Sequence, residues 1–309
     1  MDQAIKFRHL QTFLEVARQR SVSKAAEVLS LSQPAVTRTI RELETALGVR
    51  LFEKDGRGIR ISRFGEVFLR HAGASVTSLR QGVDSIQQAL RSEGPPIRIG
   101  ALPTVSARIM PEAVAQFLKE GTGSPIKVVT GDNSVLLEQL RLGELDLVVG
   151  RLAPPEAMMG LSFEPLYSEN VVFAVRSGHP LLKKPHFSLD ELRDYTILMP
   201  TPSAVIRPFV DRFLVSNGIA ELPIQIETVS DAFGRAYIRA HDGIWIISEG
   251  AVANDIRDGR VNILPIDTSE TVGSVGLTTR AGSEQPLPLA IFMQSIRATA
   301  RTASAGSAD

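Results

Sequence analysis

The chain has 309 residues, a length that indicates about two domains. Of these residues 43% are hydrophobic and 22% charged, which is the composition of a globular protein. Cysteine is absent, which excludes disulfides, thiolate nucleophiles and Cys-ligated zinc. The sequence shows no secretory signal pattern and no run of about 18 apolar residues, so we expect a cytoplasmic protein without a membrane span. The net charge is zero, but residues 1–90 carry 14 Lys and Arg against 9 Asp and Glu, while the remainder carries 20 against 25. This asymmetry indicates a nucleic-acid-facing N-terminal part.

The first 50 residues predict three helices. Apolar residues recur at three- and four-residue steps in the first, as an amphipathic helix requires: Phe7, Leu10, Phe13, Leu14 and Ala17. Ser21 or Ser23 can cap a second helix that runs to Leu29. Pro34 fits the first turn of a third helix, which ends at Gly48.

The second and third helices have the spacing of a helix-turn-helix. In this motif the second helix enters the major groove, and its N-terminal residues meet base edges. The outward polar positions of that helix are Ser32, Gln33, Thr37, Arg38 and Arg41, and the inward apolar positions are Val36, Ile40 and Leu43. Gln33 can pair with adenine and Arg38 with guanine, each through two hydrogen bonds, whereas Arg41 is better placed for phosphate. The alternative is a small helical bundle with an ordinary basic face.

A β-hairpin is predicted after the third helix. Residues 51–54 and 59–62 alternate in and out around the glycine-rich tip 55–58. Arg57 and Arg60 lie on this hairpin, where a wing can reach the DNA backbone or the minor groove.

Residues 64–90 carry the clearest periodic pattern of the chain. The apolar residues follow steps of four and then alternate between four and three: Phe64, Phe68, Ala72, Val76, Leu79, Val83, Ile86 and Leu90. That alternation predicts a coiled-coil seam covered by a partner helix. We therefore expect a homodimer whose contact residues are Phe68, Ala72, Val76, Leu79, Val83 and Ile86. The alternative is that the seam packs on the first domain of the same chain.

The pattern changes after residues 92–96, which contain one glycine and two prolines and predict a hinge. Short apolar strands now alternate with helices, which predicts α/β layers with largely parallel sheets. The predicted strands are 97–101, 126–130, 145–149, 171–175, 224–227, 244–247, 261–264 and 275–278, and the predicted helices are 109–119, 135–142, 205–217 and 231–239. From Ser304 to Asp309 the residues are small and polar, and we expect a disordered tail.

Residues 1–90 closely resemble the winged helix-turn-helix of LysR-type transcriptional regulators. The matching segments are 13–17, 23–26, 32–38, 40–44, 47–52 and Gly65. The resemblance implies a transcriptional activator that binds double-stranded promoter DNA and contacts RNA polymerase. It also implies a homodimer or homotetramer that responds to a small-molecule effector. It also places Gln33, Pro34, Thr37, Arg38 and Arg57 where family members touch DNA. Lys54 and Arg63 depart from the family pattern, but both keep or add positive charge.

The same resemblance implies the fold of the whole chain. It is an α/β protein with an N-terminal winged helix-turn-helix, a long dimerisation linker helix and a C-terminal effector domain, whose two subdomains are similar to type 2 periplasmic binding proteins. The expected boundaries are 1–62 for the DNA-binding domain, 63–91 for the linker helix, 92–96 for the hinge, 97–303 for the effector domain and 304–309 for the tail. The first subdomain takes 97–167 with 267–303, and the second takes 168–266.

Within the family, four segments are most similar to regulators of protocatechuate catabolism in the β-ketoadipate pathway: 6–11, 57–62, 66–73 and 95–110. This similarity implies that the effector is a small carboxylate. Regulators of galactose-linked uptake share several of these features and remain an alternative.

Polar residues at three predicted strand-to-helix turns are candidate effector ligands. They are Thr104, Ser106, Asn133, Thr201 and Ser203. By resemblance, all of them except Ser106 lie where family members hold effectors in a cleft between subdomains. Arg151 and Arg207 are the nearest cationic partners for an acid. Helix capping is the alternative for each hydroxyl, and surface ion pairing for each arginine.

We do not expect an enzyme, a metal or a cofactor. The sequence has no G-x-S-x-G elbow, phosphate-binding loop or H-E-x-x-H motif, and its five histidines lack metal-like spacing. Two other classes of protein share part of this pattern. A solute-binding component would need a signal peptide and no basic head, and a nucleoid-type protein would bind any duplex without an effector.

Overall fold

The computed structural model describes residues 5–56, 58–91, 96–219 and 221–305. The chain divides into two compact units: residues 1–95 with 138–145, and residues 96–137 with 146–309. No helix among the described residues is long and apolar enough to cross a bilayer.

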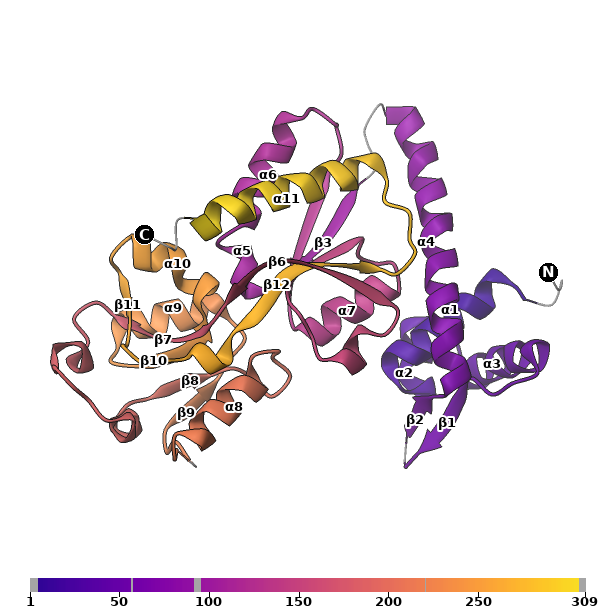
Figure 1. Cartoon of the computed structure of the whole chain (residues 1–309). Helices are drawn as coiled ribbons and strands as arrows, with labels where there is room; N and C mark the ends of the chain where they lie inside the picture. Colours follow the sequence, from indigo (N-terminus) through magenta and orange to yellow (C-terminus); the bar gives the residue numbers. More distant parts are fainter. Residues whose placement is uncertain (1–4, 57, 92–95, 220, 306–309) are drawn as a thin grey trace. The chain divides into compact units, whose positions relative to one another are not determined.

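The N-terminal head contains three short helices, a hairpin and a long helix (Figure 1). Its elements are α1 (Phe7–Gln19), α2 (Val22–Val28), α3 (Gln33–Leu47), β1 (Phe52–Asp55), β2 (Gly58–Ile61) and α4 (Arg63–Arg91). The Ser21 hydroxyl accepts from the Lys24 backbone N–H, so Ser21 caps α2. Gly48 ends α3 in the left-handed conformation, at φ 69°.

Aromatic packing and one buried acid hold the head together. Phe13 is fully buried, and its ring lies 5.3 Å from that of Phe52 and 5.1 Å from that of Phe68. The buried Glu44 carboxylate accepts from the Leu51 N–H at 2.8 Å, which ties the end of α3 to the start of the wing. A Cβ on Gly65 would lie 2.3 Å from the Leu51 carbonyl oxygen, so only glycine lets α4 approach the wing this closely.

The long helix α4 does not present its whole apolar seam to a partner. Phe68, Ala72 and Val76 pack on the core of the head, whereas Leu79, Val83 and Ile86 are about half exposed or more. The prediction that all six residues form a dimer seam is therefore corrected for the first three. They are occupied within the chain because the small head needs α4 to cover its own apolar face.

The second unit contains two subdomains, each built on a five-stranded sheet. The first sheet has the strand order β4-β3-β5-β12-β6. Its strands and helices are β3 (Ile97–Ala101), α5 (Pro103–Ser106), α6 (Met110–Lys119), β4 (Ile126–Thr130), α7 (Asn133–Arg141), β5 (Leu147–Arg151), β6 (Leu161–Glu169), β12 (Gly273–Arg280) and α11 (Leu287–Ala305). From residue 138 on, α7 belongs to the first unit. Helices α6 and α11 lie side by side (Figure 1), and Phe117 meets Phe292 between them with ring centroids 5.3 Å apart.

The second sheet has the strand order β11-β7-β10-β8-β9. Its elements are β7 (Val171–Arg176), β8 (Ile197–Met199), α8 (Arg207–Ser216), β9 (Gln225–Glu227), α9 (Asp231–Ala240), β10 (Ile244–Ser248), α10 (Glu249–Arg257) and β11 (Val261–Ile263). Short 3-10 turns at 155–158, 180–183, 189–194 and 269–271 complete the unit. Trp245, on the central strand β10, is 2% exposed and packs against Gly234 of α9.

The prediction of largely parallel sheets is wrong, because both sheets are mixed. β3 is parallel to β4 and β5, but β12 is antiparallel to β5 and β6. In the second sheet β8 is parallel to β9 and β10, whereas β7 is antiparallel to β10 and β11. The chain passes between the subdomains through β6 and β7 and returns through β12, so these strands join their sheets without a helical crossover.

Five elements of the second unit were not predicted. These are β6, β8, α5, α10 and α11. β6 is an edge strand with irregular burial, and β8 and α5 are only three and four residues long, so each carries little periodic signal. Helix α11 continues through Ala305, because alanine-rich segments favour helix, so the predicted tail is wrong at its first two residues. Its remaining residues, 306–309, and 92–95 of the predicted hinge lie outside the described residues.

Candidate nucleic-acid interface and ligand pocket

Helix α3 presents a polar face made by its first two and a half turns. The Ser32 hydroxyl accepts from the Ala35 N–H and caps the helix, and Pro34 occupies the first turn. Most of the predicted DNA-facing positions are exposed (Ser32, Gln33, Pro34, Arg38 and Arg41), and Thr37 is half-buried. The predicted inward residues Val36, Ile40 and Leu43 are buried. The helix therefore divides into an apolar side and a polar side at the predicted residues.

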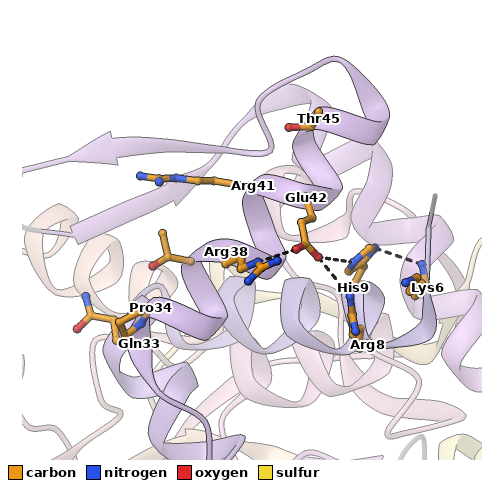
Figure 2. A pocket seen from close by; sticks show the side chains of 10 residues that line it. Lys6, Arg8, His9, Gln33, Pro34, Arg38, Arg41, Glu42 and Thr45 are labelled. Carbon is orange, nitrogen blue, oxygen red and sulfur yellow. Dashed lines mark hydrogen bonds and ion pairs between the residues drawn. The ribbon is translucent and has the colours of Figure 1, made fainter.

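A broad, positively charged groove lies along this polar side, with a volume of about 1140 Å³. Residues from α3 and from the start of α1 line it: Lys6, Arg8, His9, Gln33, Pro34, Thr37, Arg38, Arg41, Glu42 and Thr45. Four of these are Lys or Arg and one is an acid (Figure 2). An open groove with an excess of guanidinium and ammonium groups suits a polyanion such as the DNA backbone.

The wing carries one of the predicted DNA contacts, Arg60, at an exposed position. Arg60 on β2 forms an ion pair with Glu53 on β1, with 2.5 Å between Nη2 and Oε2. Gly56 adopts φ 55° at the hairpin tip, a conformation that suits a two-residue turn. Arg57, the other predicted wing contact, lies outside the described residues.

The second unit holds a cavity of about 80 Å³ between its two subdomains. The first subdomain contributes the turns after β3 and β4 and the last residue of β5, and the second contributes residues around β8, β9 and β10. The lining residues are Leu102, Pro103, Thr104, Gly131, Asp132, Asn133, Arg151, Pro200, Ala204, Val205, Ile206, Thr228, Val229, Asp231, Trp245, Ile247 and Ser248. Since one buried water needs roughly 10–15 Å³ of such space, the cavity holds about five to eight waters, as a small-molecule pocket does.

Among the described residues, Arg151 at the end of β5 is the one arginine or lysine that lines this cavity. The residue is 4% exposed, its Nη2 donates to the Thr271 carbonyl, and its guanidinium lies 4.7 Å from the centre of the Phe209 ring. Its Nε and Nη1 have no hydrogen-bond partner among the described residues. Burial lowers the pKa of Arg151 below its usual range, while the nearby Glu169 carboxylate opposes that shift. The pocket wall therefore contains a buried cation with unused hydrogen-bond donors.

Thr104 and Glu169 form a buried polar link beside the cavity. The Thr104 hydroxyl donates to Glu169 Oε1, and the Gly250 N–H at the start of α10 donates to Oε2 at 3.1 Å. Burial raises the pKa of the Glu169 carboxyl, with the Thr104 hydrogen bond acting in the opposite direction. This link joins the first subdomain, the end of β6 and the second subdomain.

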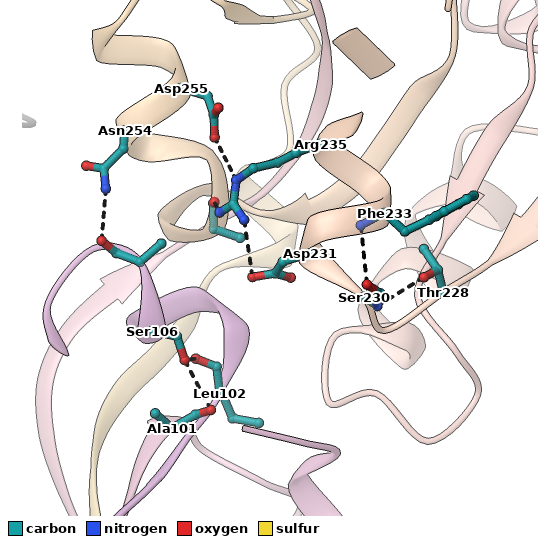
Figure 3. Close-up of polar contacts among 12 residues, drawn as sticks. Ala101, Leu102, Ser106, Thr228, Ser230, Asp231, Phe233, Arg235, Asn254 and Asp255 are labelled. Atoms are coloured by element: carbon teal, nitrogen blue, oxygen red, sulfur yellow. Dashed lines mark hydrogen bonds and ion pairs between the residues drawn. The ribbon is translucent and has the colours of Figure 1, made fainter. Parts of the chain in front are cut away.

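Helix α9 contributes Asp231 to the cavity lining, and an ion pair joins α9 to α10 (Figure 3). Arg235 donates to Asp255 at 2.8 Å, and its guanidinium lies 3.9 Å from Asp231. Burial raises the pKa of Asp231, which lines the cavity. The Asn254 side-chain amide donates to the Ala107 carbonyl at 2.9 Å and so connects the second subdomain with the first.

The cavity brings together three of the seven predicted effector residues: Thr104, Asn133 and Arg151. The other four do not line it. Ser106 donates to the Leu102 carbonyl at 3.0 Å and caps its own turn (Figure 3). Thr201 and Ser203 contact each other at 3.2 Å, and Ser203 also donates to Asp132 at 3.1 Å.

Arg207 is already paired. It donates to Asp211 at 2.7 Å, to Glu227 at 2.8 Å and to the Pro200 carbonyl at 2.8 Å. The hydrogen bond with Glu227, and after it that with Asp211, raises the pKa of Arg207. The prediction that it pairs with an acidic ligand in the pocket is therefore replaced by the alternative of an ion pair within the chain.

Sequence reasoning missed several lining residues, above all Trp245, Ser248 and Asp231. Trp245 carried one usable signal, since it is the single tryptophan and lies in a predicted strand. Asp231 carries no such signal, because acidic residues are common in the first turn of a helix. Among the described residues no cluster of His, Asp and Glu could hold a metal ion.

Comparison with known proteins gives matches over both units. Residues 7–66 match the family "Bacterial regulatory helix-turn-helix protein, lysR family", and residues 91–301 match the "LysR substrate binding domain". The HTH-type transcriptional regulator PcaQ of Agrobacterium fabrum is 64% identical over 300 residues, covering 97% of this chain and 96% of that protein. The uncharacterized HTH-type transcriptional regulator YdcI of Escherichia coli is 32% identical over 295 residues, covering 96% of each chain. Full-length OxyR from Pseudomonas aeruginosa shares the fold with a TM-score of 0.62 at 21% identity, over 97% of this chain and 98% of that one.

Proposed function

The chain belongs to the LysR family of bacterial transcriptional regulators, and from this premise we propose that its head reads promoter DNA while its second unit senses a small carboxylate. The observation that carries the ligand class is Arg151, a buried guanidinium at the cavity wall with two unpartnered nitrogens among the described residues. A carboxylate can accept a hydrogen bond from either of these nitrogens, and its negative charge offsets that of the guanidinium.

In the head, the proposed base-reading residues are Gln33 and Arg38, near the N-terminus of the recognition helix. Arg41, Arg57 and Arg60 contact phosphates. Ser32, Pro34 and Thr37 complete the surface, and the cationic groove supports this assignment. Binding of this kind weakens with added salt because each neutralised phosphate releases counterions.

We assign the exposed apolar residues Leu79, Val83 and Ile86 of α4 to a subunit contact. A homodimer presents two recognition helices to two half-sites, and a homotetramer joins two such pairs. The regulator acts in the cytoplasm as an activator, and its contact with RNA polymerase follows from that role.

Effector binding acts through the two subdomains. The cavity has walls from both, so a ligand that contacts both walls favours one arrangement of them over another. It shifts the equilibrium only by the difference between its affinities for the two arrangements. If an effector bound while the DNase I footprint and transcription stayed unchanged, this mechanism would fail.

The pathway we propose is protocatechuate catabolism, and the 64% identity with PcaQ over nearly the whole chain supports it. The test is thermal stability of the full-length protein against protocatechuate, β-carboxymuconate, β-ketoadipate, galactose and simple amino acids. A ligand that binds only the folded state stabilises it by about 2.7 kcal/mol at a hundredfold excess over Kd. The fluorescence of Trp245, which lines the cavity, gives a second readout.

A stabilising shift with one of the pathway acids is the expected result, and it should be lost in Arg151→Gln. A shift with galactose alone would contradict the carboxylate assignment and indicate regulation of galactose-linked uptake. A separate assay with random competitor DNA tests the head. Equal affinity for promoter and random duplexes would indicate a nucleoid-type protein.

A further inference from the structure

Of the described residues that line the cationic groove of the head, one is acidic: Glu42 of α3. A carboxylate in a groove that faces DNA phosphates weakens binding by electrostatic repulsion. Glu42 lies between the base-reading positions of α3 and the start of α1. The residues that contact it therefore indicate what benefit could offset the weaker DNA binding.

Glu42 holds the guanidinium of Arg38 one helical turn away (Figure 2). Arg38 Nε donates to Glu42 Oε1 at 2.9 Å, the i,i+4 spacing that brings two side chains together on a helix. The other carboxylate oxygen, Oε2, lies 3.4 Å from Arg8 Nη2 and 3.4 Å from His9 Nε2. The two oxygens therefore have different partners, one on α3 and the others on α1.

His9 makes the α1 side of this arrangement rigid. Its side chain is 3% exposed, and Nδ1 accepts from the Lys6 backbone N–H at 3.2 Å. Because Nδ1 accepts this hydrogen bond, Nε2 is the ring nitrogen that carries a proton, and it faces Glu42 Oε2. Chiefly through the Arg38 hydrogen bond, the pKa of Glu42 is lowered, so the carboxylate stays charged at neutral pH.

The consequence falls on Arg38, whose side chain is 82% exposed. An exposed arginine samples many rotamers, and ordering it on DNA costs conformational entropy. With Nε hydrogen-bonded to Glu42, the guanidinium edge formed by Nη1 and Nη2 stays available to DNA, because no described residue accepts a hydrogen bond from it. That edge matches the O6 and N7 acceptors of guanine. Arg41 differs, because it has no ion-pair partner among the described residues and points away from Glu42 in Figure 2.

We propose that Glu42 is a positioning residue that orients Arg38 for base recognition, lowering overall DNA affinity and raising selectivity at one base position. The proposal rests on the base-reading role proposed for Arg38. The competing explanation is that Glu42 only repels DNA and affects every sequence alike.

The experiment measures base preference with full-length protein and a library of duplexes that carry a random core of about 30 bp, long enough for two half-sites. The variants are Glu42→Ala, Glu42→Gln, Arg38→Ala and the double variant Arg38→Ala/Glu42→Ala. Glu27→Ala is the matched control, because Glu27 is an exposed acid of α2 outside the groove. Sequencing of the selected duplexes gives the preference at each position, and titration of one random duplex gives non-specific affinity.

Arg38→Ala should remove the preference at one position of each half-site. Glu42→Ala should reduce the preference at that same position about two- to twelvefold, the loss expected when an arginine is no longer pre-ordered. Glu42→Gln should lie between wild type and Glu42→Ala. Random-duplex affinity should rise in both Glu42 variants and in Glu27→Ala, but Glu27→Ala should leave every positional preference unchanged.

The double variant separates positioning from repulsion. In the Arg38→Ala background, Glu42→Ala should change no positional preference, because the residue through which it acts is gone. If Glu42→Ala left the Arg38-dependent preference intact, or changed all positions equally, the positioning role would be overturned while base reading by Arg38 stood. If Arg38→Ala itself altered no single position, both would be overturned.

Discussion

The DNA-facing groove of the head and the cavity of the second unit are both lined by arginine, but they are built in different ways. Most of the groove residues lie between Gln33 and Thr45 on one helix, and their charged groups are largely exposed. The described residues that line the cavity span Leu102 to Ser248, and the arginine among them, Arg151, is 4% exposed. A surface for DNA can be assembled by one helix, whereas a pocket for a small molecule needs several segments to meet and exclude water.

The difference in burial also determines how much binding free energy each arginine contributes. An exposed guanidinium in water gains little from one partner, so the head relies on several cations acting together on a polyanion. A buried guanidinium without a full set of acceptors is costly, and a ligand that supplies them gains more from each bond. The following predictions test this contrast, from the largest expected effect to the smallest.

The largest effect should come from the separate cores of the two regions. Phe13→Ala in the head and Phe292→Ala in the second unit each remove a fully buried ring, and each should lower the free energy of unfolding of its own region by about 3–5 kcal/mol. Hydrogen exchange on the full-length protein should show lost amide protection in α1–α3 for the first variant and in β3–β5 for the second. Equal loss of protection in both regions for either variant would contradict independent cores.

Arg151→Gln should weaken effector binding by about 2–5 kcal/mol, because the ligand carboxylate loses its buried cationic partner. Arg207→Gln is the matched control: it removes an arginine whose partners, Asp211 and Glu227, lie within the chain. Titration monitored by Trp245 fluorescence measures both. Similar affinities for the two variants would show that burial does not distinguish these arginines.

In the head, Arg38→Ala should reduce discrimination at one base position by about 1–3 kcal/mol. Arg41→Ala should instead weaken binding to all sequences and lower the salt slope by about 1, as the loss of one phosphate contact does. Affinities for the selected and a random duplex, measured at several salt concentrations, separate the two. Equal losses on both duplexes for Arg38→Ala would contradict its base-reading role.

The smallest effect should come from a half-exposed arginine in the second unit, which forms an ion pair at the surface. Arg297 on α11 donates to both oxygens of Glu164 on β6, at 2.7 and 2.9 Å, and lowers the pKa of that half-exposed carboxyl. Glu164→Gln should cost about 0.2–1 kcal/mol of unfolding free energy at neutral pH.

The sign of its pH dependence follows from that lowered pKa. The stabilisation is present above the unfolded-state pKa near 4.5 and is lost as the pH falls through the folded-state pKa. The Tm difference between wild type and Glu164→Gln should therefore shrink on acidification. Glu284→Gln, at an exposed position in the loop before α11, should leave Tm unchanged at every pH. A difference that persisted in acid would contradict the ion pair as its cause.

Much of the head could be predicted from the sequence, because its signals are local. Ser32, Pro34 and Gly48 mark the two ends of α3 through capping and backbone geometry, and the 3.6-residue period separates its buried side from its exposed side. In the second unit the same reasoning located β3, β4 and α9 closely. It missed the edge strand β6 and the antiparallel pairing of β12 with β6. Those features depend on which segment lies alongside, which a local pattern does not contain.

The sequence by itself determined that the chain has a helix-turn-helix with a polar recognition face, a long helix and an α/β region. Only the tertiary structure decided which side chains act together. It divided the α4 seam between the head core and solvent, buried Arg151 while pairing Arg207, and placed Trp245 beside turns more than a hundred residues earlier in the chain. Capping and periodicity are set within a few residues, but burial and pairing are set by packing between distant segments, and that packing distinguishes a ligand from a helix cap.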